Sequence, residues 1–444
     1  MSELSPLLLI VDYNLTRVAD VAHLAQAAKV RHQANTILIR ADPGARDFEI
    51  CTHVIDLDPL AEHFVDTASE RLAPYRSRLR AGLVFSDNAV QRGAELLERL
   101  GLAVDSAALA AGAFNKRSYR LAEGRARPLL EAQGLLAPAS VEVRSVDDLR
   151  AFAASHPDGF VVKPSCEGNN RGVTIVRAGD SLDEAFDAVR PYLHHGAICE
   201  TLIPYRREYS FDGVGDVEFV TEKLSASGKY PVEIAQILPA RLSPAEQATL
   251  TRAGRLANLL VGQRRGAFHN EIKLSDDGLA AAVVEPNRRP AGMKIWTIAQ
   301  AVYGIDFYAQ WLDAAFGEAR PATPAAGATQ AATVMLGVPH AGWFAPPAAA
   351  EAERLLSGAL TRTASRAGLP VSALRLIEWG WLSAQPRYLP DLPRENGDFA
   401  AQVCIAVDSG QAEIRELVPA LREAWLAILA EAGLPSRQAL TIAA

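Results

Sequence analysis

The chain has 444 residues, 49% of them hydrophobic and 22% charged, which is ordinary for a folded globular protein and excludes global disorder. Its net charge of −7 argues against nucleic acids and anionic membranes as partners, because their binding depends on clustered positive charge. Four scattered cysteines without CxxC spacing argue against a disulfide scaffold or zinc knuckle and indicate a reducing compartment. The apolar run at 7–11 is too short for a signal peptide or membrane span, so we expect a cytoplasmic protein.

Short apolar runs alternate with helical patterns over the first hundred residues. The runs lie at 7–11, 36–39, 53–57 and 82–85. Strands that alternate with helices predict a parallel sheet with helices on its faces. No GxGxxG sequence follows the first run, so a dinucleotide site there is not supported. We therefore assign residues 1–112 to an α/β domain whose sheet forms one wall of a cleft.

The pattern changes to α+β organisation over residues 113–316. A helix is predicted from Asn115, and 208–222 is rich in strand-forming residues. Ser243, Pro244 and Glu246 are typical of the start of a capped helix. Strands are predicted at 267–274 and 279–285, and the Asp-Gly between them is a hairpin signal.

A break in composition follows at 317–332, where seven Ala, two Pro and two Gly show no apolar periodicity. We interpret this stretch as a linker. A small C-terminal α/β unit is predicted over 333–444. Its expected strands lie at 333–338 and 401–407, and its expected helices at 351–367 and 411–429.

Lys163 stands at the end of an apolar strand, and the loop 165–172, with Gly168 and Gly172, follows it. A lysine charge beside backbone N–H groups that glycine makes accessible suits phosphate binding. The sequence is not a P-loop, because no GK[ST] opens a helix. Taken alone, the segment fits a solvated hairpin with an ordinary surface lysine equally well.

Two glutamates downstream have the same ambiguity. Glu200 ends an apolar strand and Glu208 enters the next one. Connected strands of this kind can offer backbone groups to an adenine edge and a carboxylate to ribose hydroxyls. The alternative is an ordinary pair of glutamates on edge strands.

The hairpin carries the strongest group of residues. His269 and Glu271 lie on its first strand, and alternation puts Glu285, Asn287 and Arg289 on one face of its second. Carboxylate and amide oxygens suit Mg²⁺, which takes few protein ligands besides phosphates and waters. Arg289 is then within reach of the same anion. A salt-bridge ladder is the alternative interpretation.

Together and in this order, these pieces resemble an ATP-grasp ligase from about residue 5 to residue 316. The closest resemblance is to carboxylate–amine ligases of the branch that includes L-amino acid ligases. The motifs that carry it are FNKRSYR, KPSCEGNNRGV, REYSFDG, PVEIAQILPARL, HNEIKL and VVEPNRRPAG. The resemblance implies an ATP-grasp fold with a pre-ATP domain at 1–112 and an ATP-grasp domain at 113–316, whose lid is formed by 138–205.

The resemblance also implies a role for each matching position. ATP would be contacted by Lys116, Lys163, Ser165, Gly168, Asn170, Gly172, Glu200, Thr201, Ile203 and Glu208. Mg²⁺, or alternatively Mn²⁺, would be held by Glu271, Glu285 and Asn287. The catalytic residues would be Lys163, Glu285 and Arg289. Substrates would be contacted by Glu233, His269, Arg289 and Met293.

The implied activity is ATP-dependent joining of a small carboxylate, such as an amino acid, to an amine through an acyl phosphate, giving ADP, phosphate and a dipeptide or amide. A carboxylate–thiol ligase or a small-molecule kinase is the alternative. A non-catalytic nucleotide-binding protein is a further one, which the intact metal-binding set argues against. Relatives often have Glu-x-x-His where this chain has Glu233 and Gln236, so the acid and the amine stay open. The resemblance also implies that the protein can form a homodimer.

Overall fold

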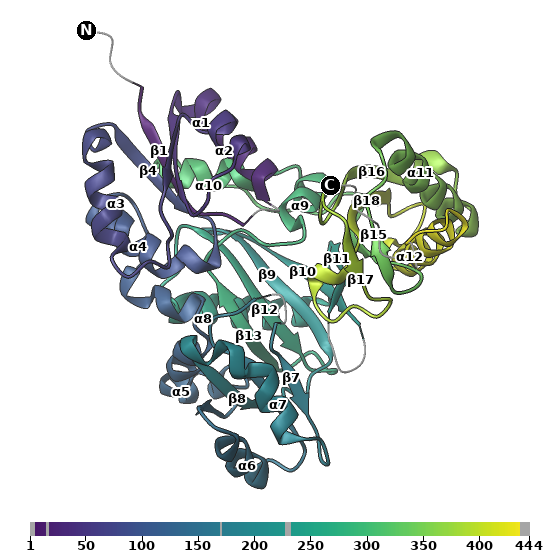
Figure 1. Cartoon of the computed structure of the whole chain (residues 1–444), viewed down its shortest axis with the longest axis horizontal. Coiled ribbons are helices and arrows are strands. Elements are labelled where there is room, and N and C mark those ends of the chain that lie inside the picture. The colour runs from purple at the N-terminus through teal and green to yellow at the C-terminus, as the bar shows by residue number, and fades with distance from the viewer. Residues whose placement is uncertain (1–4, 15–16, 169–170, 227–231, 436–444) are drawn as a thin grey trace, which may run out of the picture.

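The N-terminal part of the computed structural model is a parallel sheet, as predicted (Figure 1). The structure describes residues 5–14, 17–168, 171–226 and 232–435. The sheet has the order β3-β2-β1-β4. Its strands are β1 (Leu7–Val11), β2 (Asn35–Arg40), β3 (His53–Asp56) and β4 (Leu79–Val84). All of β1 is buried because the two faces of the strand enter different cores, which explains its uninterrupted apolar sequence.

Helices cover both faces of this sheet. They are α1 (Val18–His32), α2 (Ala45–Ile50), α3 (Phe64–Leu72) and α4 (Val90–Arg99). Leu8 and Ile10 pack in a core with α1, whereas Leu7 and Leu9 pack in a core with α3 and α4. Each strand residue therefore meets a helix on its own side of the sheet.

A smaller four-stranded sheet, in the order β5-β8-β6-β7, lies within the segment predicted to be the lid. Its strands are β5 (Ser140–Val143), β6 (Phe160–Pro164), β7 (Thr174–Val176) and β8 (Ala197–Thr201). Helices α6 (Val146–Ser155) and α7 (Leu182–Val189) pack on it and close a separate core. This segment therefore has a core of its own.

The largest sheet has eight antiparallel strands in the order β13-β12-β9-β10-β11-β14-β18-β16. The first five in chain order are β9 (Arg207–Val214), β10 (Val217–Ser225), β11 (Glu233–Leu238), β12 (Ala267–Leu274) and β13 (Ala281–Asn287). The others are β14 (Thr329–Leu336), β16 (Arg375–Trp381) and β18 (Ala401–Asp408). The predicted C-terminal unit thus continues the sheet of the central domain. A separate pair, β15 (Gly342–Phe344) and β17 (Arg387–Leu389), lies beside it.

Two segment boundaries predicted from the sequence are wrong, one for the linker and one for a strand. The linker does not run to residue 332, because Thr329 already opens β14. Ala331 and Ala332 are fully buried on opposite faces of that strand, so its small residues belong to a core and only resemble a linker in composition. Strand β13 starts at Ala281 instead of 279, because the turn before it is longer and is closed by the Ser275 N–H donating to the Ala280 carbonyl at 2.9 Å.

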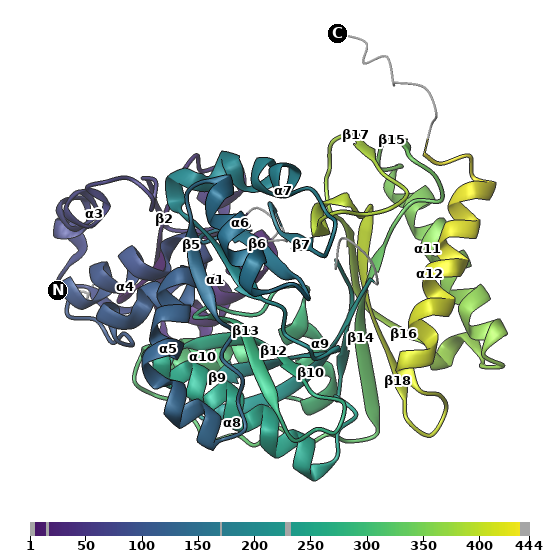
Figure 2. The ribbon, with the colours of Figure 1, turned by 90° about the horizontal axis from the view of Figure 1, so that it is seen from below.

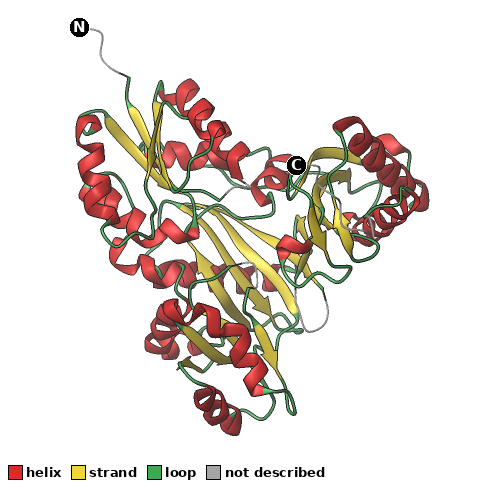
Figure 3. Cartoon of the chain, viewed as in Figure 1, coloured by secondary structure: helices red, strands yellow, loops and turns green. Residues whose placement is uncertain are grey.

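The two faces of the large sheet differ in their coverage. One face packs against α8 (Pro244–Leu260) and against α11 (Ala349–Arg366) and α12 (Ile414–Glu431), which lie beyond β14, β16 and β18 in Figure 2 and in the right-hand arm of Figure 3. The opposite face carries the polar side chains of the site. At the β14–β18 end it is covered by α9 (Ile295–Tyr303), and α10 (Phe307–Ala315) packs in the same core.

Helix α5 (Lys116–Ala132) stands between the sheets, and Asn115 caps it by accepting from the Ser118 N–H at 2.9 Å. The predicted cap of α8 is confirmed, with the Ser243 N–H donating to the Glu246 carboxylate at 2.7 Å. The four cysteines are free thiols. Within the described ranges, no helix is long and apolar enough to cross a membrane.

Candidate active site

Lys116 connects the start of α5 to two other parts of the site. Its ammonium donates to the Glu285 carboxylate at 2.7 Å and to the Glu167 carbonyl at 2.7 Å, and its backbone N–H donates to the Ser165 carbonyl at 2.9 Å. The lysine therefore links the helix, the loop after β6 and the metal-binding strand predicted from the sequence.

Lys163 is more buried than its place at the edge of a loop suggested. Its side chain is 5% exposed and pairs with Glu200 on β8, whose carboxylate also accepts from the Arg120 Nε at 2.7 Å. Burial alone would raise the pKa of Glu200, but the charges of Arg120 and Lys163 lower it from 4.5 to about 2. Both oxygens of the Glu200 carboxylate thus accept hydrogen bonds from Arg120 or Lys163. Recognition of adenine by Glu200 stays a prediction, which the side-chain contacts do not support.

The loop between β6 and β7 contains a glycine that its own packing requires. Gly172 has φ +68°, and a Cβ there would lie 2.8 Å from the Tyr192 ring. Among the described residues, the buried Ser165 Oγ has no hydrogen-bond partner, so it is free to meet a ligand. Gly168 lies in the same loop, and Asn170 lies outside the described residues.

The two predicted metal ligands meet across the hairpin. Glu271 on β12 stands directly opposite Glu285 on β13. Like charges in directly opposed positions destabilise a sheet, so each carboxylate needs a cation. In the structure, Lys116 supplies one to Glu285 at 2.7 Å and Lys223 supplies one to Glu271 at 2.9 Å. Burial would raise the pKa of Glu271, but Lys223 and His269 hold it well below its usual range.

His269 and Asn287 form the next pair on the same face of this hairpin. The Asn287 Nδ2 donates to the His269 carbonyl at 3.0 Å, so the amide oxygen is the atom that Asn287 can offer to a cation. The His269 Nδ1 lies 2.6 Å from Asp212, and its Nε2 lies 3.8 Å from Glu271. Burial lowers the pKa of His269, but Asp212 outweighs it and raises the pKa to about 9. His269 is therefore placed to orient Glu271, and its predicted contact with substrate stays a prediction.

The residues present fit a magnesium ion bound together with a nucleotide. Two carboxylates and one amide oxygen are hard ligands, and Mg²⁺ commonly takes its remaining ligands from phosphates and waters. In the described part of the chain, no group of three or more His, Cys, Asp or Glu side chains could hold a metal. The donor set suits a metal carried in with phosphates, and does not suit a closed structural site.

Arg289 lies two residues beyond the end of β13, in a bend of the chain. Its guanidinium donates to Asp87, after β4, at 2.8 Å. The neighbouring Arg288 points to the other side and donates to the Ser106 carbonyl at 2.6 Å. Arg289 therefore joins the hairpin to the N-terminal domain on the side of the two glutamates.

Glu233, Gln236 and Met293 come together at the neighbouring strand β11. Lys223 bridges Glu233 to Glu271, and the Asn396 Nδ2 of the C-terminal unit lies 3.4 Å from Glu233. The Gln236 Nε2 lies 3.7 Å from the Met293 sulfur. Its Oε1 is buried without a hydrogen bond among the described residues. Met293 has φ 45°, a left-handed backbone that is uncommon for such a side chain.

The remaining predicted contacts are spread around this centre. Glu208 on β9 lies 3.1 Å from Lys273 and also accepts from Ser225, so it faces the same side of the sheet as Lys223. The Thr201 Oγ1 accepts from the Ala139 N–H at 3.2 Å. Ile203 lies in the segment between β8 and β9.

Sequence reasoning missed four residues of the site: Arg120, Lys223, Asp212 and Asp87. For two of them, the spacing along a predicted helix or strand could have indicated the position. Arg120 follows Lys116 by one helical turn, and Lys223 alternates with Thr221 on a strand that faces Glu208. Asp87 meets Arg289 from far along the chain. Asp212 accepts from the nearby Ser210 at 2.6 Å, but its link to the site, His269, lies 57 positions away.

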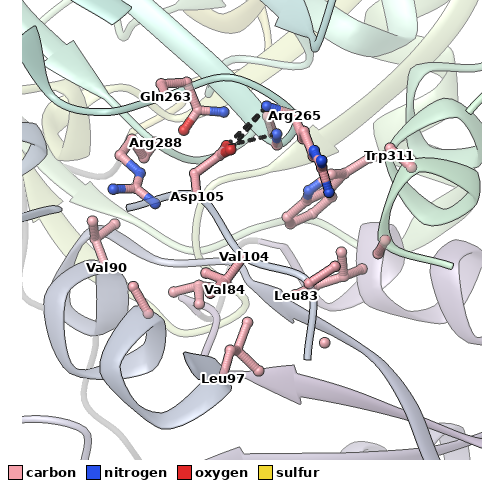
Figure 4. A pocket seen from close by; sticks show the side chains of 17 residues that line it. Leu83, Val84, Val90, Leu97, Val104, Asp105, Gln263, Arg265, Arg288 and Trp311 are labelled. Carbon is pink, nitrogen blue, oxygen red and sulfur yellow. Dashed lines mark hydrogen bonds between the residues drawn. The ribbon is translucent and has the colours of Figure 1, made fainter. Parts of the chain in front are cut away.

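One cavity lies outside this site. It has a volume of about 60 Å³ and lies between β4, α4, α10 and the segment 263–267 (Figure 4). Arg288 and Asp105 line it, and Asp105 accepts the backbone N–H groups of Arg265 and Gly266 at 3.0 and 2.8 Å. The cavity therefore lies at the contact between the N-terminal and central domains. Arg288 lines it, whereas Arg289 points to the other side of β13.

No protein-family profile matches the chain. It is 26% identical over 245 residues to the alanine–anticapsin ligase of Bacillus subtilis, and equally to that of Bacillus amyloliquefaciens. Each match covers 50% of this chain and 50% of the relative, so the chain spans about half the length of the curated relatives it matches. These names support the resemblance to carboxylate–amine ligases.

Solved structures match over nearly the whole chain. The L-amino acid ligase from Bacillus licheniformis superposes with a TM-score of 0.71 at 17% identity, covering 95% of this chain and 98% of that one. The N5-carboxyaminoimidazole synthetase from Staphylococcus aureus, complexed with ADP, gives 0.65 at 12% identity, covering 96% and 99%. Biotin carboxylase from Campylobacter jejuni gives 0.61 at 13%, covering 90% and 87%. The prediction from the sequence is thus confirmed, and the chain has the ATP-grasp fold.

Proposed function

We propose that this protein is an ATP-dependent ligase that joins a small carboxylate, an amino acid or a related acid, to an amine and releases ADP and phosphate. The observation that carries the proposal is the directly opposed pair Glu271 and Glu285, each held by a lysine, on one sheet face. A sheet has no structural need to set two carboxylates against each other. Magnesium and nucleotide phosphates would explain why the chain keeps them.

The chemistry requires activation of the acid. A carboxylate is a poor acyl donor because its leaving group would be oxide, whereas an acyl phosphate loses phosphate. Lys116 and Lys163 would offset phosphate charge during transfer of the γ-phosphoryl group. Glu271, Glu285 and Asn287 would hold Mg²⁺ or Mn²⁺, which supplies Lewis-acid stabilisation of the phosphoryl oxygens when bound.

Arg289 would then stabilise the oxyanion that develops when the amine attacks. It is a fixed donor, since its guanidinium is already oriented by Asp87. Preorganised donors of this kind typically contribute ~3 kcal/mol to the reaction barrier. The loop 165–172 would exclude water that hydrolyses the acyl phosphate.

Substrate contacts would come from the surroundings of Glu233. Its carboxylate would meet a substrate ammonium, with Met293 beside it and the Gln236 Oε1, which has no hydrogen bond to any described residue. The name alanine–anticapsin ligase of the relatives supports amino acids as substrates of this chain. We also infer a homodimer, on the resemblance alone, and a cytoplasmic location, which the scattered free cysteines support.

The test is a screen for ADP and phosphate release over pairs of amino acids and other carboxylates, followed by mass spectrometry of the product. Release that needs both an acid and an amine, with an amide product, is expected. Release with an acid and a thiol, or with a single hydroxyl-bearing substrate, would replace the proposal with a thiol ligase or a kinase.

A further inference from the structure

Arg120 is a buried arginine, 5% exposed, that connects three separate parts of the chain. It stands on α5 one turn after Lys116, so both cations lie on the same face of the helix. Its contacts reach Glu123 on the same helix, Glu200 on the lid strand β8, and two carbonyls of the catalytic strand β13.

On the lid side, Arg120 fixes the carboxylate that holds Lys163. The Arg120 Nε donates to the Glu200 Oε2 at 2.7 Å and the Nη2 to Oε1 at 3.4 Å. The second of these oxygens also accepts from Lys163. The position of the Lys163 ammonium therefore depends on a carboxylate that Arg120 orients through both of its oxygens.

On the hairpin side, Arg120 supports an irregularity in the sheet. Glu271 pairs with Glu285, but the next residue, Ile272, pairs with Val283, so Val284 is the extra residue of a β-bulge. The Arg120 Nη2 donates to the Val284 carbonyl at 2.9 Å, and the Nη1 donates to the Val283 carbonyl at 3.1 Å. The bulge is what turns Glu285 to face Glu271.

Stability alone does not require charged residues here, although removing one member would leave its partners unpaired and destabilise the fold. Arg120, Lys163, Glu123 and Glu200 are all 5% exposed or less. Buried ion networks lose most of their Coulomb energy to desolvation, and apolar residues of similar volume often serve the fold as well. The network contacts both Lys163 and strand β13, which carries Glu285. Its desolvation cost is better explained if the network fixes the positions of these two residues.

We propose that Arg120 is a positioning residue that sets the phosphate-binding Lys163 and the metal-binding Glu285 in one fixed arrangement. Through Glu200 it holds the lysine, and through the Val284 carbonyl it holds the bulge that aims the glutamate. Neither end requires Arg120 to touch nucleotide or substrate. The inference rests on the proposed function, because it assigns the two residues to the same bound nucleotide.

The experiment compares Arg120→Met/Glu123→Gln with Glu123→Gln alone. The double variant removes one positive and one negative charge, so that Lys163 and Glu200 remain as a balanced pair and folding is spared. Affinity for MgATP is measured by titration calorimetry, and turnover by ADP release. We expect the double variant to bind MgATP about tenfold or more weakly, the factor for one lost charge-assisted hydrogen bond, and to turn over more slowly. Glu123→Gln should keep both values, and Arg120→Lys should recover part of the loss.

Three results would overturn the inference. The first is a folded double variant with unchanged affinity and turnover. The second is a loss that Glu123→Gln shares in full, which would make the network structural. The third is a failure of the unsubstituted protein to bind MgATP, which would overturn the proposed function as well. Binding of MgATP without turnover on any acid and amine would instead refute only the ligase activity and leave the affinity comparison decisive.

Discussion

Replacing Glu200 by glutamine removes the carboxylate that Arg120 and Lys163 share. A carboxyl group whose pKa falls from 4.5 to about 2 on folding contributes about 3 kcal/mol of stability at neutral pH. The isosteric amide keeps the volume but loses this contribution. We therefore expect Glu200→Gln to lower the free energy of unfolding by about 3 kcal/mol at pH 7, far more than the ~0–1 kcal/mol of an exposed pair.

The assay is urea unfolding followed by circular dichroism at pH 7 and again at pH 3. The folded pKa is depressed, so the contribution is complete above pH 4.5 and is lost as the pH falls toward 2. The difference between the wild type and Glu200→Gln should therefore shrink at pH 3.

Glu123→Gln is the matched control, because Glu123 is the other buried partner of Arg120. Burial outweighs the nearby arginine and raises the pKa of Glu123, so its charged form gains nothing from folding. Its replacement should cost little at either pH. Equal effects of the two glutamines, or an effect of Glu200→Gln below about 1 kcal/mol, would refute the assignment of Glu200 as the electrostatic centre of the network.

Three further predictions concern the reaction. Lys163→Met, which keeps the buried stem, should weaken MgATP binding by about tenfold or more in titration calorimetry; unchanged affinity would remove Lys163 from the phosphate site. Glu285→Gln should raise the Mg²⁺ concentration needed for ADP formation. Arg289→Ala should slow product formation by about 100-fold and leave ATP hydrolysis without product. The ratio of ADP to product, measured over a Mg²⁺ titration, distinguishes the two variants, and equal ratios would contradict these separate roles. Phosphorus NMR of a complete reaction should show ADP and phosphate, and stoichiometric pyrophosphate would require an adenylating mechanism instead.

Local sequence patterns predicted many of the helices and strands. The alternation in Ala267–Leu274 predicted β12 with its observed ends, and the Ser243–Glu246 cap predicted the start of α8. These features depend on neighbours within a few residues, so the sequence contains them directly. The order of lysines and glutamates also led to the ATP-grasp resemblance, because a motif keeps its spacing when the rest of a chain diverges.

Contacts between distant residues could not be read in the same way. Arg120 meets Glu200 from 80 positions away, and no periodicity in either segment announces the pairing. The first four residues of β14 lie in an alanine-rich stretch that the composition assigns to a linker, because two-sided burial favours the same small residues that a linker tolerates. The continuity of the sheet from β11 to β14 is likewise a long-range pairing, without a local signal.

The continuous sheet has a consequence for the C-terminal unit. Directly opposed residues share a face, and one row of them runs from Lys223 on β10 through Gln236 and Thr333 to Cys404 on β18. Gln236, Thr333 and Cys404 in this row are buried, and the Thr333 Oγ1 and the Cys404 sulfur lie 3.3 Å apart. The row begins at Lys223, which holds both Glu271 and Glu233, and the C-terminal unit reaches this point directly, because the Asn396 Nδ2 lies 3.4 Å from Glu233. We therefore expect that unit to help form the substrate pocket, and truncation before β14 should abolish ligase activity while exposing the apolar face under α11 and α12.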